Sequence, residues 1–354
     1  MEVLPASLRR FNKNKLALAG GLFILGLILL SLLGHFIALD STPNANLQEL
    51  SLRFVKPGYT AFFLDTSQDE NDNKNFRNSR SANLALGQRI LIDRFYYDGA
   101  RLHYRKYHSS TWRQSANSNP ANIKKVVFYL GTDGLGRDVY SRLILGTRIS
   151  LQVGLVAVLI SLLIGVIAGS VAGYYGGWRD KMILWWMNVF WAIPTVLLSM
   201  AMLISFTGKN EQQIWMVFLA VGLTMWVDTA RLIRGLFLQL KERQFVEATE
   251  ALGFSDGRII FKHILPNTLP SLIVMTASNF ASAILMESGL SYLGLGVQPP
   301  APSWGSMLRE YYSYLGTDVS YLALFPGLAI TLAVFSFYAF GNGLRDAWDV
   351  KGMP

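Results

Sequence analysis

The chain has 354 residues, of which 51% are hydrophobic and 16% are charged, and its mean hydropathy is +0.30. This composition argues against an ordinary soluble protein and indicates a chain that lies in a lipid bilayer. The formal net charge is +9, and the absence of cysteine excludes disulfides and thiolate metal sites.

Charge-free segments recur along the chain. The first, residues 16–39, has a longer apolar stretch than the roughly 7–15 residues of a signal-peptide core, so it predicts a first membrane helix. A weaker run, 212–227, reaches spanning length only if Asp228 lies at the interface or in a protein-lined cavity. The others exceed the roughly 20 residues that a spanning helix needs, which predicts six membrane helices in total; these runs are 149–178, 182–208, 263–286 and 319–344.

The distribution of Lys and Arg predicts the orientation of these helices. If the N-terminus is cytoplasmic, the inner segments hold 14 basic residues, whereas the short outer segments around Lys209 and Arg309 hold one each. An excess of positive charge in cytoplasmic loops is the usual pattern, so both termini are expected in the cytoplasm. The basic character of the chain therefore needs no nucleic acid to explain it. The inner segments counted are 1–15, 174–181, 231–263 and 345–354.

A long polar and aromatic segment, 40–130, follows the first helix. Its middle, 66–83, is rich in Asn, Asp and Ser and predicts an unstructured stretch. Farther on, Asp98-Gly99 separates two Tyr-rich runs in which apolar and polar residues alternate, and this pattern predicts a β-hairpin in a small domain outside the membrane. Such a domain could be an insertion that only packs on the outer face, or a docking surface for an outer partner. The four histidines show no metal-ligand spacing; they are His35, His103, His108 and His263.

Two patterns within the helices concern packing. Gly165, Gly169 and Gly173 recur every four residues, which lets a neighbouring helix approach closely in lipid. Pro194 removes a backbone donor and predicts a kink in the third helix.

Two carboxylates lie at or near membrane depth. Asp228 precedes Arg231 by three residues, which favours an ion pair along the helix near its cytoplasmic end. Glu287 follows 23 charge-free residues after His263, so its side chain must face protein or water. It is a candidate for the translocation pathway, and a hydrogen-bonded structural role is an equal alternative.

The polar segment between the fourth and fifth helices, residues 241–266, is called the elbow below. Phe245, Ala248 and Leu252 lie at helical spacing, and Gly253 supplies the reversal that a helix end needs. Ser255 is placed to cap a second short helix, with Asp256 in its first turn. Pro266 then marks the start of the fifth membrane helix. A helix–turn–helix elbow joined to two membrane helices suits the transmission of force better than catalysis.

This segment resembles the EAA loop of ATP-binding-cassette (ABC) importer permeases, in which Glu-Ala-Ala is followed at fixed spacing by Gly, Ile and Leu-Pro. Glu247, Ala248, Gly253, Leu265 and Pro266 match this pattern, while Thr249 replaces the second alanine and His263 replaces the isoleucine. The stretch "FKHILPN" resembles the form that this motif takes in the dipeptide and oligopeptide branch of these permeases.

Three further stretches resemble the second permease, or C-type subunit, of that branch. They are "LGTDGLGRDVYSRLILGTRISL", "GYYGG" and "LSYLGLGVQPPAPSWGSML". The resemblance covers the N-terminus to Leu39 and nearly all of 130–354, while 40–130 is longer than the branch leads one to expect.

The resemblance implies an all-α polytopic membrane protein with a type I ABC importer permease core of six transmembrane helices and a small extracytoplasmic insertion with β structure. Its expected parts are a cytoplasmic N-terminus and first helix (1–39), the insertion (40–130) and a permease domain (131–354) that contains the coupling elbow. The expected location is the bacterial cytoplasmic (inner) membrane.

The resemblance also implies partners: a homologous permease subunit, two ATP-binding-cassette ATPase subunits, an extracytoplasmic solute-binding protein and a peptide substrate. No G-x-x-x-x-G-K-[ST] motif occurs, so ATP hydrolysis is expected on separate subunits, and no catalytic, cofactor or metal residue is expected here. Nickel complexes or other small solutes are alternative cargo, and a secondary transporter is a remote alternative. The residues expected to contact the ATPase are Glu247, Ala248, Gly253, Phe254, Ser255, Leu265 and Pro266.

Overall fold

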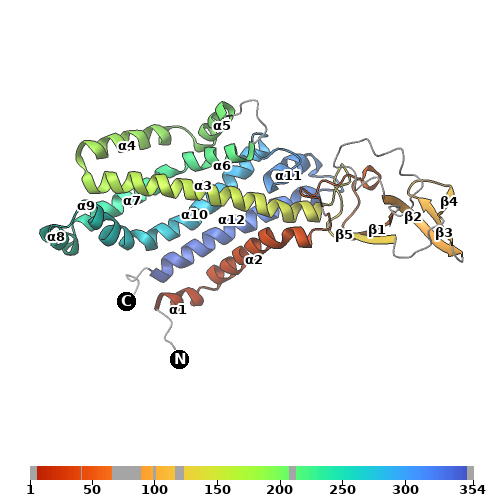
Figure 1. Ribbon diagram of the computed structural model, residues 1–354, viewed down its shortest axis with the longest axis horizontal. Helices are drawn as coiled ribbons and strands as arrows, with labels where there is room; N and C mark the ends of the chain where they lie inside the picture. Colours follow the sequence, from red (N-terminus) through yellow and green to blue (C-terminus); the bar gives the residue numbers. More distant parts are fainter. Residues whose placement is uncertain are drawn as a thin grey trace. The chain divides into compact units, whose positions relative to one another are not determined.

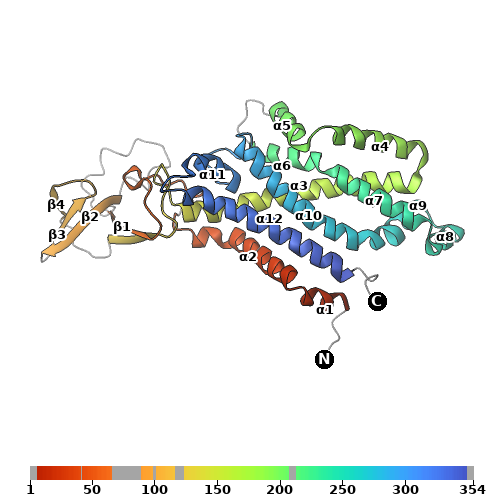
Figure 2. The same ribbon diagram turned by 180° about the vertical axis from the view of Figure 1, so that it is seen from behind.

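The computed structural model describes residues 6–40, 42–65, 89–98, 101–115, 123–206 and 213–348. The chain divides into two compact units, which are described separately. The larger unit comprises Met1–Gly34 with Leu145–Pro354, and the smaller unit is His35–Ile144. Figures 1 and 2 show that the larger unit is helical and that the sheet belongs to the smaller one.

Long apolar helices form the larger unit, because the chain satisfies its backbone hydrogen bonds within each helix where water is absent. Five of the described helices are long and apolar enough to cross a membrane, and a bent helix pair brings the number to six if it counts as one span. The helices are α1 (Ala6–Lys13), α2 (Lys15–Ile37), α3 (Val139–Tyr175), α4 (Gly177–Ala192), α5 (Thr195–Phe206), α6 (Gln213–Thr224), α7 (Trp226–Lys241), α8 (Gln244–Ala251), α9 (Asp256–Arg258), α10 (Leu265–Tyr292), α11 (Trp304–Tyr311) and α12 (Tyr321–Trp348).

The bent pair confirms the kink predicted at Pro194. Helices α4 and α5 meet at an angle of 91°, and the break between them contains Ile193 and Pro194. Proline ends α4 here because it has no backbone N–H to donate and its ring collides with the preceding turn.

The predicted close approach at the glycine stripe is also confirmed. A Cβ built on Gly169 would lie 2.5 Å from the carbonyl oxygen of Ala230, and one built on Gly173 would lie 2.6 Å from the Cβ of Phe237. Helix α3 therefore packs with its backbone against α7, and no larger residue fits at these contacts.

The apolar core of the larger unit joins α3, α5, α6 and α10. Val153, Ala157, Val217, Ala220 and Ala283 are fully buried within it. On the outside, α2 presents mostly exposed Leu, Ile and Phe side chains, as expected for a helix that contacts lipid.

The smaller unit contains a five-stranded antiparallel sheet with the order β4-β3-β2-β1-β5. Successive side chains along a strand point to opposite faces of the sheet. Phe63 and Leu91 therefore lie in one apolar cluster and Leu64, Ile92 and Leu102 in another, so apolar side chains pack on both faces of the sheet. The remaining elements are a 3-10 turn, Leu50–Leu52, and another in the larger unit, Tyr312–Tyr314. The strands are β1 (Tyr59–Asp65), β2 (Arg89–Asp98), β3 (Arg101–Lys106), β4 (Trp112–Ser115) and β5 (Ile123–Phe128).

The predicted hairpin is present as the antiparallel pair β2 and β3, in which Asp98 is opposite Arg101. Leu102 and Tyr104 are buried while Arg101 is exposed, as the alternation predicted. Gly99 at the turn, and the stretch 66–83 that was expected to be unstructured, lie outside the described residues.

Candidate functional site

The first arm of the elbow is helix α8. It begins after Arg243, whose backbone is extended, and it buries Val246 and Thr249 while Phe245 and Glu247 remain exposed. Spacing of three residues between the buried positions gives this short helix one inward and one outward face. The motif residues Glu247 and Ala248 therefore lie on the outward face.

Gly253 makes the turn that ends α8, as predicted. Its φ is +72°, a left-handed conformation that glycine adopts without steric cost. The N–H of Gly253 donates to the carbonyl of Glu250 at 2.9 Å, and the N–H of Phe254 donates to that of Thr249 at 3.2 Å. These two bonds define a Schellman motif. A Cβ on Gly253 would meet no atom within 4 Å, so the requirement for glycine comes from the backbone alone.

The second arm differs from the expected separate short helix. Residues Asp256–Tyr292 form one continuous helical span of 37 residues, and within it the α-helix α10 begins at Leu265 with Pro266 in its first turn, as predicted. A π-helical segment, Ile259–Ile264, precedes Pro266, and the N–H of Leu265 donates to the carbonyl of Ile260. This wider turn accommodates a proline that cannot donate to the preceding turn, and the helix continues through it.

Ser255 occupies the N-cap position of this arm, but its side chain makes no capping hydrogen bond. The expected position is confirmed, and the expected side-chain cap is not. Asp256 lies in the first turn, where its charge complements the helix dipole.

A buried apolar cluster lies beneath both arms. Val246 comes from the first arm and Ile264 from the second, while Ile233 and Phe237 come from α7. All four side chains are fully buried. Because α7 packs against both arms, the elbow is fixed to the end of the helix from which it emerges.

Tyr174, at the end of α3, bonds to both sides of the elbow, a role that was not predicted from the sequence. Its hydroxyl donates to Oδ1 of Asp256 at 3.2 Å, and its carbonyl accepts from Nζ of Lys241 at 2.9 Å. Nearby, Arg234 donates two hydrogen bonds to Asp180, at 2.6 and 2.7 Å. The "GYYGG" stretch that contains Tyr174 was the only sequence signal for this link.

The outward surface of the elbow is apolar as well as polar. Leu252 is 71% exposed and Phe261 is 70% exposed, and Phe245 is also exposed. Large apolar side chains at the end of a membrane protein, next to charged residues, are typical of a protein-binding surface. Figures 1 and 2 show α8 at the same end of the larger unit as α1 and the last turns of α12.

Two family models match the chain. Residues 148–350 match the "binding-protein-dependent transport system inner membrane component", and residues 6–53 match the "N-terminal TM domain of oligopeptide transport permease C". The chain belongs to the binding-protein-dependent permease family. It is a multi-pass inner-membrane permease of ABC importers, in the dipeptide and oligopeptide branch, and the first match includes the whole elbow.

Curated relatives agree with this assignment. The dipeptide transport system permease protein DppC of Alkalihalophilus pseudofirmus is 38% identical over 69% of this chain and 78% of the relative. The glutathione transport system permease protein GsiD of Pectobacterium atrosepticum is 41% identical over 63% of this chain and 72% of the relative. Among solved structures, an inward-facing MetNI methionine ABC transporter chain is 20% identical, with a TM-score of 0.46 over 58% of this chain and 95% of that chain.

The remaining predicted elbow residues of the permease lie on or near the turn. Phe254 is half-buried, with Arg258 5.0 Å above its ring, and its ring lies 5.9 Å from that of His263. Leu265 is half-buried and Pro266 is exposed. The structure thus brings the predicted coupling residues together at one end of the permease.

Glu287 lies away from the elbow, 21 residues after Pro266 along α10. Its side chain is fully buried and accepts hydrogen bonds from Ser291 at 2.8 Å and Ser150 at 3.3 Å. The carboxyl therefore links α10 to α3 within this chain.

The prediction that Asp228 pairs with Arg231 is wrong. Arg231 donates to Oδ1 of Asn188 at 3.0 Å, and Asp228 is exposed with no ion pair in the described part of the chain. Helical spacing favoured a bond between Asp228 and Arg231. In the folded chain Arg231 instead bonds to Asn188 of α4.

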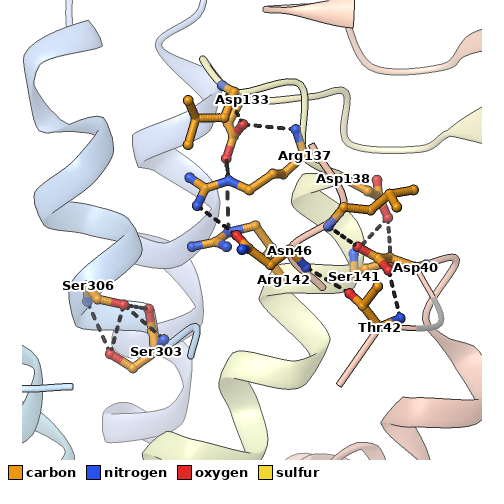
Figure 3. A network of polar contacts seen from close by, with 12 residues as sticks. Asp40, Thr42, Asn46, Asp133, Arg137, Asp138, Ser141, Arg142, Ser303 and Ser306 are labelled. Atoms are coloured by element: carbon orange, nitrogen blue, oxygen red, sulfur yellow. Dashed lines mark hydrogen bonds and ion pairs between the residues drawn. The ribbon is translucent and has the colours of Figure 1, made fainter. Parts of the chain in front are cut away.

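The "TDGLGRD" stretch of the smaller unit forms a buried polar network (Figure 3). Asp133 accepts from the backbone and side chain of Arg137, and Asp138 accepts from the N–H and hydroxyl of Ser141. The Ser141 hydroxyl in turn accepts from the N–H groups of Leu39 and Asp40. Burial raises the pKa of Asp138 above its ordinary value, and the hydrogen bonds from Ser141 oppose this rise.

The same close-up shows a second polar arrangement, at the start of α11 in the larger unit (Figure 3). Ser303 accepts from the N–H of Ser306, whose hydroxyl accepts from the N–H of Ser303. This reciprocal capping box fixes where α11 begins.

Proposed function

We propose that this permease carries short peptides inward across the cytoplasmic membrane as one half of a translocation pathway, with a homologous permease as the other half. Two ATP-binding-cassette ATPase subunits would supply the energy, and an extracytoplasmic solute-binding protein would deliver the peptide. The names of the relatives support peptide cargo, because they refer to dipeptide and glutathione transport.

The observation that carries this proposal is the elbow. It presents Glu247, Ala248 and Leu252 outward, yet its two arms are continuous with, or packed onto, membrane helices. A push on the second arm would reach α10 directly, since the helix has no break between Asp256 and Tyr292. We infer that ATPase closure moves the elbow as a rigid body and tilts α7 and α10.

The proposed orientation has both termini and the elbow in the cytoplasm. The excess of Lys and Arg in those segments supports this orientation. The position of α8, α1 and the last turns of α12 at one end of the larger unit supports it as well. The insertion 40–130 would then be extracytoplasmic, where its sheet is available to the binding protein, while 1–39 and 131–354 form the membrane part.

For Glu287 we favour the structural alternative over a place in the translocation pathway. Full burial and the bonds to Ser150 and Ser291 support a role in holding α10 against α3. A group that contacts passing cargo needs access to water, which this carboxyl lacks within the single chain.

The function is tested by uptake of a radiolabelled dipeptide into proteoliposomes that contain the complete complex, with binding protein outside and ATP inside. We expect uptake that requires both ATP and the binding protein, and that unlabelled dipeptide inhibits more strongly than a nickel complex. Uptake driven by an ion gradient without ATP would overturn the importer mechanism, and preference for the nickel complex would overturn the peptide cargo.

A further inference from the structure

Asp228 is an ionisable residue that the elbow mechanism does not use. It lies within the span Ile214–Lys241, its side chain is exposed, and no hydrogen bond or ion pair involves it in the described part of the chain. A charged side chain at the centre of a bilayer is energetically costly, so such residues face protein or water.

The packing of α3 places Asp228 at the middle of the membrane. A Cβ built on Gly165 would lie 2.6 Å from the Cβ of Thr229 and 2.8 Å from the carbonyl oxygen of Trp226. Gly165 is near the centre of the charge-free run 149–178 of α3. Asp228, between these two contacts, therefore lies at mid-depth and not at the cytoplasmic end that the sequence suggested.

Helix α10 gives the same depth independently. The side-chain amide of Asn279 donates to Oγ1 of Thr229 at 3.0 Å, and Asn279 lies within the charge-free run 263–286 of α10. Thr229 and Asn279 are both buried. The next residue, Asp228, points away from this buried contact and out of the chain.

Further polar groups accompany Asp228 on this surface. Arg231 is half-exposed, donates to Asn188 of α4, and lies 4.6 Å from the ring centre of Trp191. Asn188 is exposed and Trp191 is 67% exposed. The surface thus holds a free carboxylate beside a guanidinium whose position is fixed by an amide and an indole ring.

We propose that Asp228 binds the terminal ammonium group of the peptide during passage and that Arg231 binds its carboxylate. Residues three apart on a helix have Cβ atoms about 5–6 Å apart, and two extended residues span about 7 Å, so a zwitterionic dipeptide matches the spacing of the two charges. The inference rests on the proposed peptide cargo. Asn188 and Trp191 are positioning residues, because they hold the guanidinium.

Access to Asp228 is tested with thiol chemistry, which the absence of cysteine in this chain makes direct. Asp228→Cys is compared with Leu163→Cys, since Leu163 is 65% exposed near the same depth of α3. In the complete complex, whose other subunits lack accessible cysteines, we expect a charged methanethiosulfonate to label Asp228→Cys at least tenfold faster, and saturating dipeptide to slow this labelling. No labelling in any nucleotide state would mean that the partner permease covers Asp228, and would overturn the proposal.

Recognition of the ammonium group is tested by uptake. We expect Asp228→Asn to lower kcat/KM for dipeptide uptake at least tenfold and Asp228→Glu, which keeps the charge, to restore most of it. Equal uptake by the Asn variant and the native complex would overturn the proposal. If the native complex itself fails to take up peptide with ATP, the proposed function falls first, so the two failures are distinguishable.

Discussion

Tyr174 links three parts of the permease through one residue. Its hydroxyl holds Asp256 at the start of the second arm, and its carbonyl holds Lys241 at the end of α7. The hydroxyl bond fixes the elbow to α3, whereas the carbonyl bond does not depend on the identity of the side chain.

Tyr174→Phe removes only the hydroxyl bond. We expect an assembled complex that transports about two- to tenfold fewer peptides per ATP hydrolysed, because a hydrogen bond contributes about 0.5–1.5 kcal/mol. The measurement is simultaneous uptake and phosphate release in proteoliposomes. The matched control is Tyr175→Phe, since Tyr175 is 42% exposed and its ring stacks with Arg179. An unchanged ratio for Tyr174→Phe would contradict the link.

Asp138 predicts a dependence of stability on pH. Its folded pKa is raised by burial, so its favourable contribution to folding is complete below the unfolded pKa of about 3.9 and is lost as pH rises through the folded value. The Asn variant has no carboxyl to ionise, so we expect its Tm to rise relative to that of the native protein between pH 4 and pH 7. Each kcal/mol of folding stability that the native protein loses corresponds to a Tm difference of about 2–4 °C. A pH-independent difference, measured by differential scanning fluorimetry, would refute this.

At the scale of elements, the stripe of glycines on α3 sets the distance to α7. Gly169→Ala adds a Cβ 2.5 Å from the carbonyl of Ala230, so we expect a loss of about 1–3 kcal/mol in stability and a lower yield of assembled complex. Gly289→Ala is the control, because a Cβ at Gly289 meets no atom within 4 Å. Equal thermal stability and yield for the two variants would contradict the packing.

Much of the fold could be predicted from sequence because the signals are local. Long charge-free runs predicted the membrane spans, and the alternation around Asp98 predicted the pair β2 and β3. Pro194 predicted a kink, which is a bend of 91° in the structure. Gly253 was predictable for the same reason, since a positive φ strongly favours glycine.

The contacts that sequence could not predict depend on tertiary structure. Arg234 and Asp180 are 54 residues apart, and Tyr174 and Asp256 are 82 apart, so no periodicity reveals either pair. The continuity of the second arm with α10 was not predictable either, because only the backbone shows that a π-helical segment, Ile259–Ile264, joins α9 to α10.

At the scale of the whole permease, the proposed function depends on a rigid path from the elbow into the membrane. The Schellman turn at Gly253 connects an exposed helix to a span of 37 residues, and the buried cluster holds both arms to α7. The surface around Asp228 lies on α7, which such a movement would tilt. Coupling and cargo contact would thus share one helix.

Transmission of force through the elbow is tested most directly at Gly253. Asn tolerates a left-handed conformation, whereas Pro fixes φ near −65° and removes the N–H that bonds to Glu250. Assembly is confirmed first for Gly253→Asn, Gly253→Pro and the milder Gly253→Val, and ATP hydrolysis and peptide uptake are then measured in the same vesicles. We predict that the Asn variant stays within about twofold of native uptake per ATP and that an assembled Pro or Val complex loses about tenfold, or 1.4 kcal/mol of coupling. Undiminished uptake per ATP in the assembled Pro complex would contradict the account.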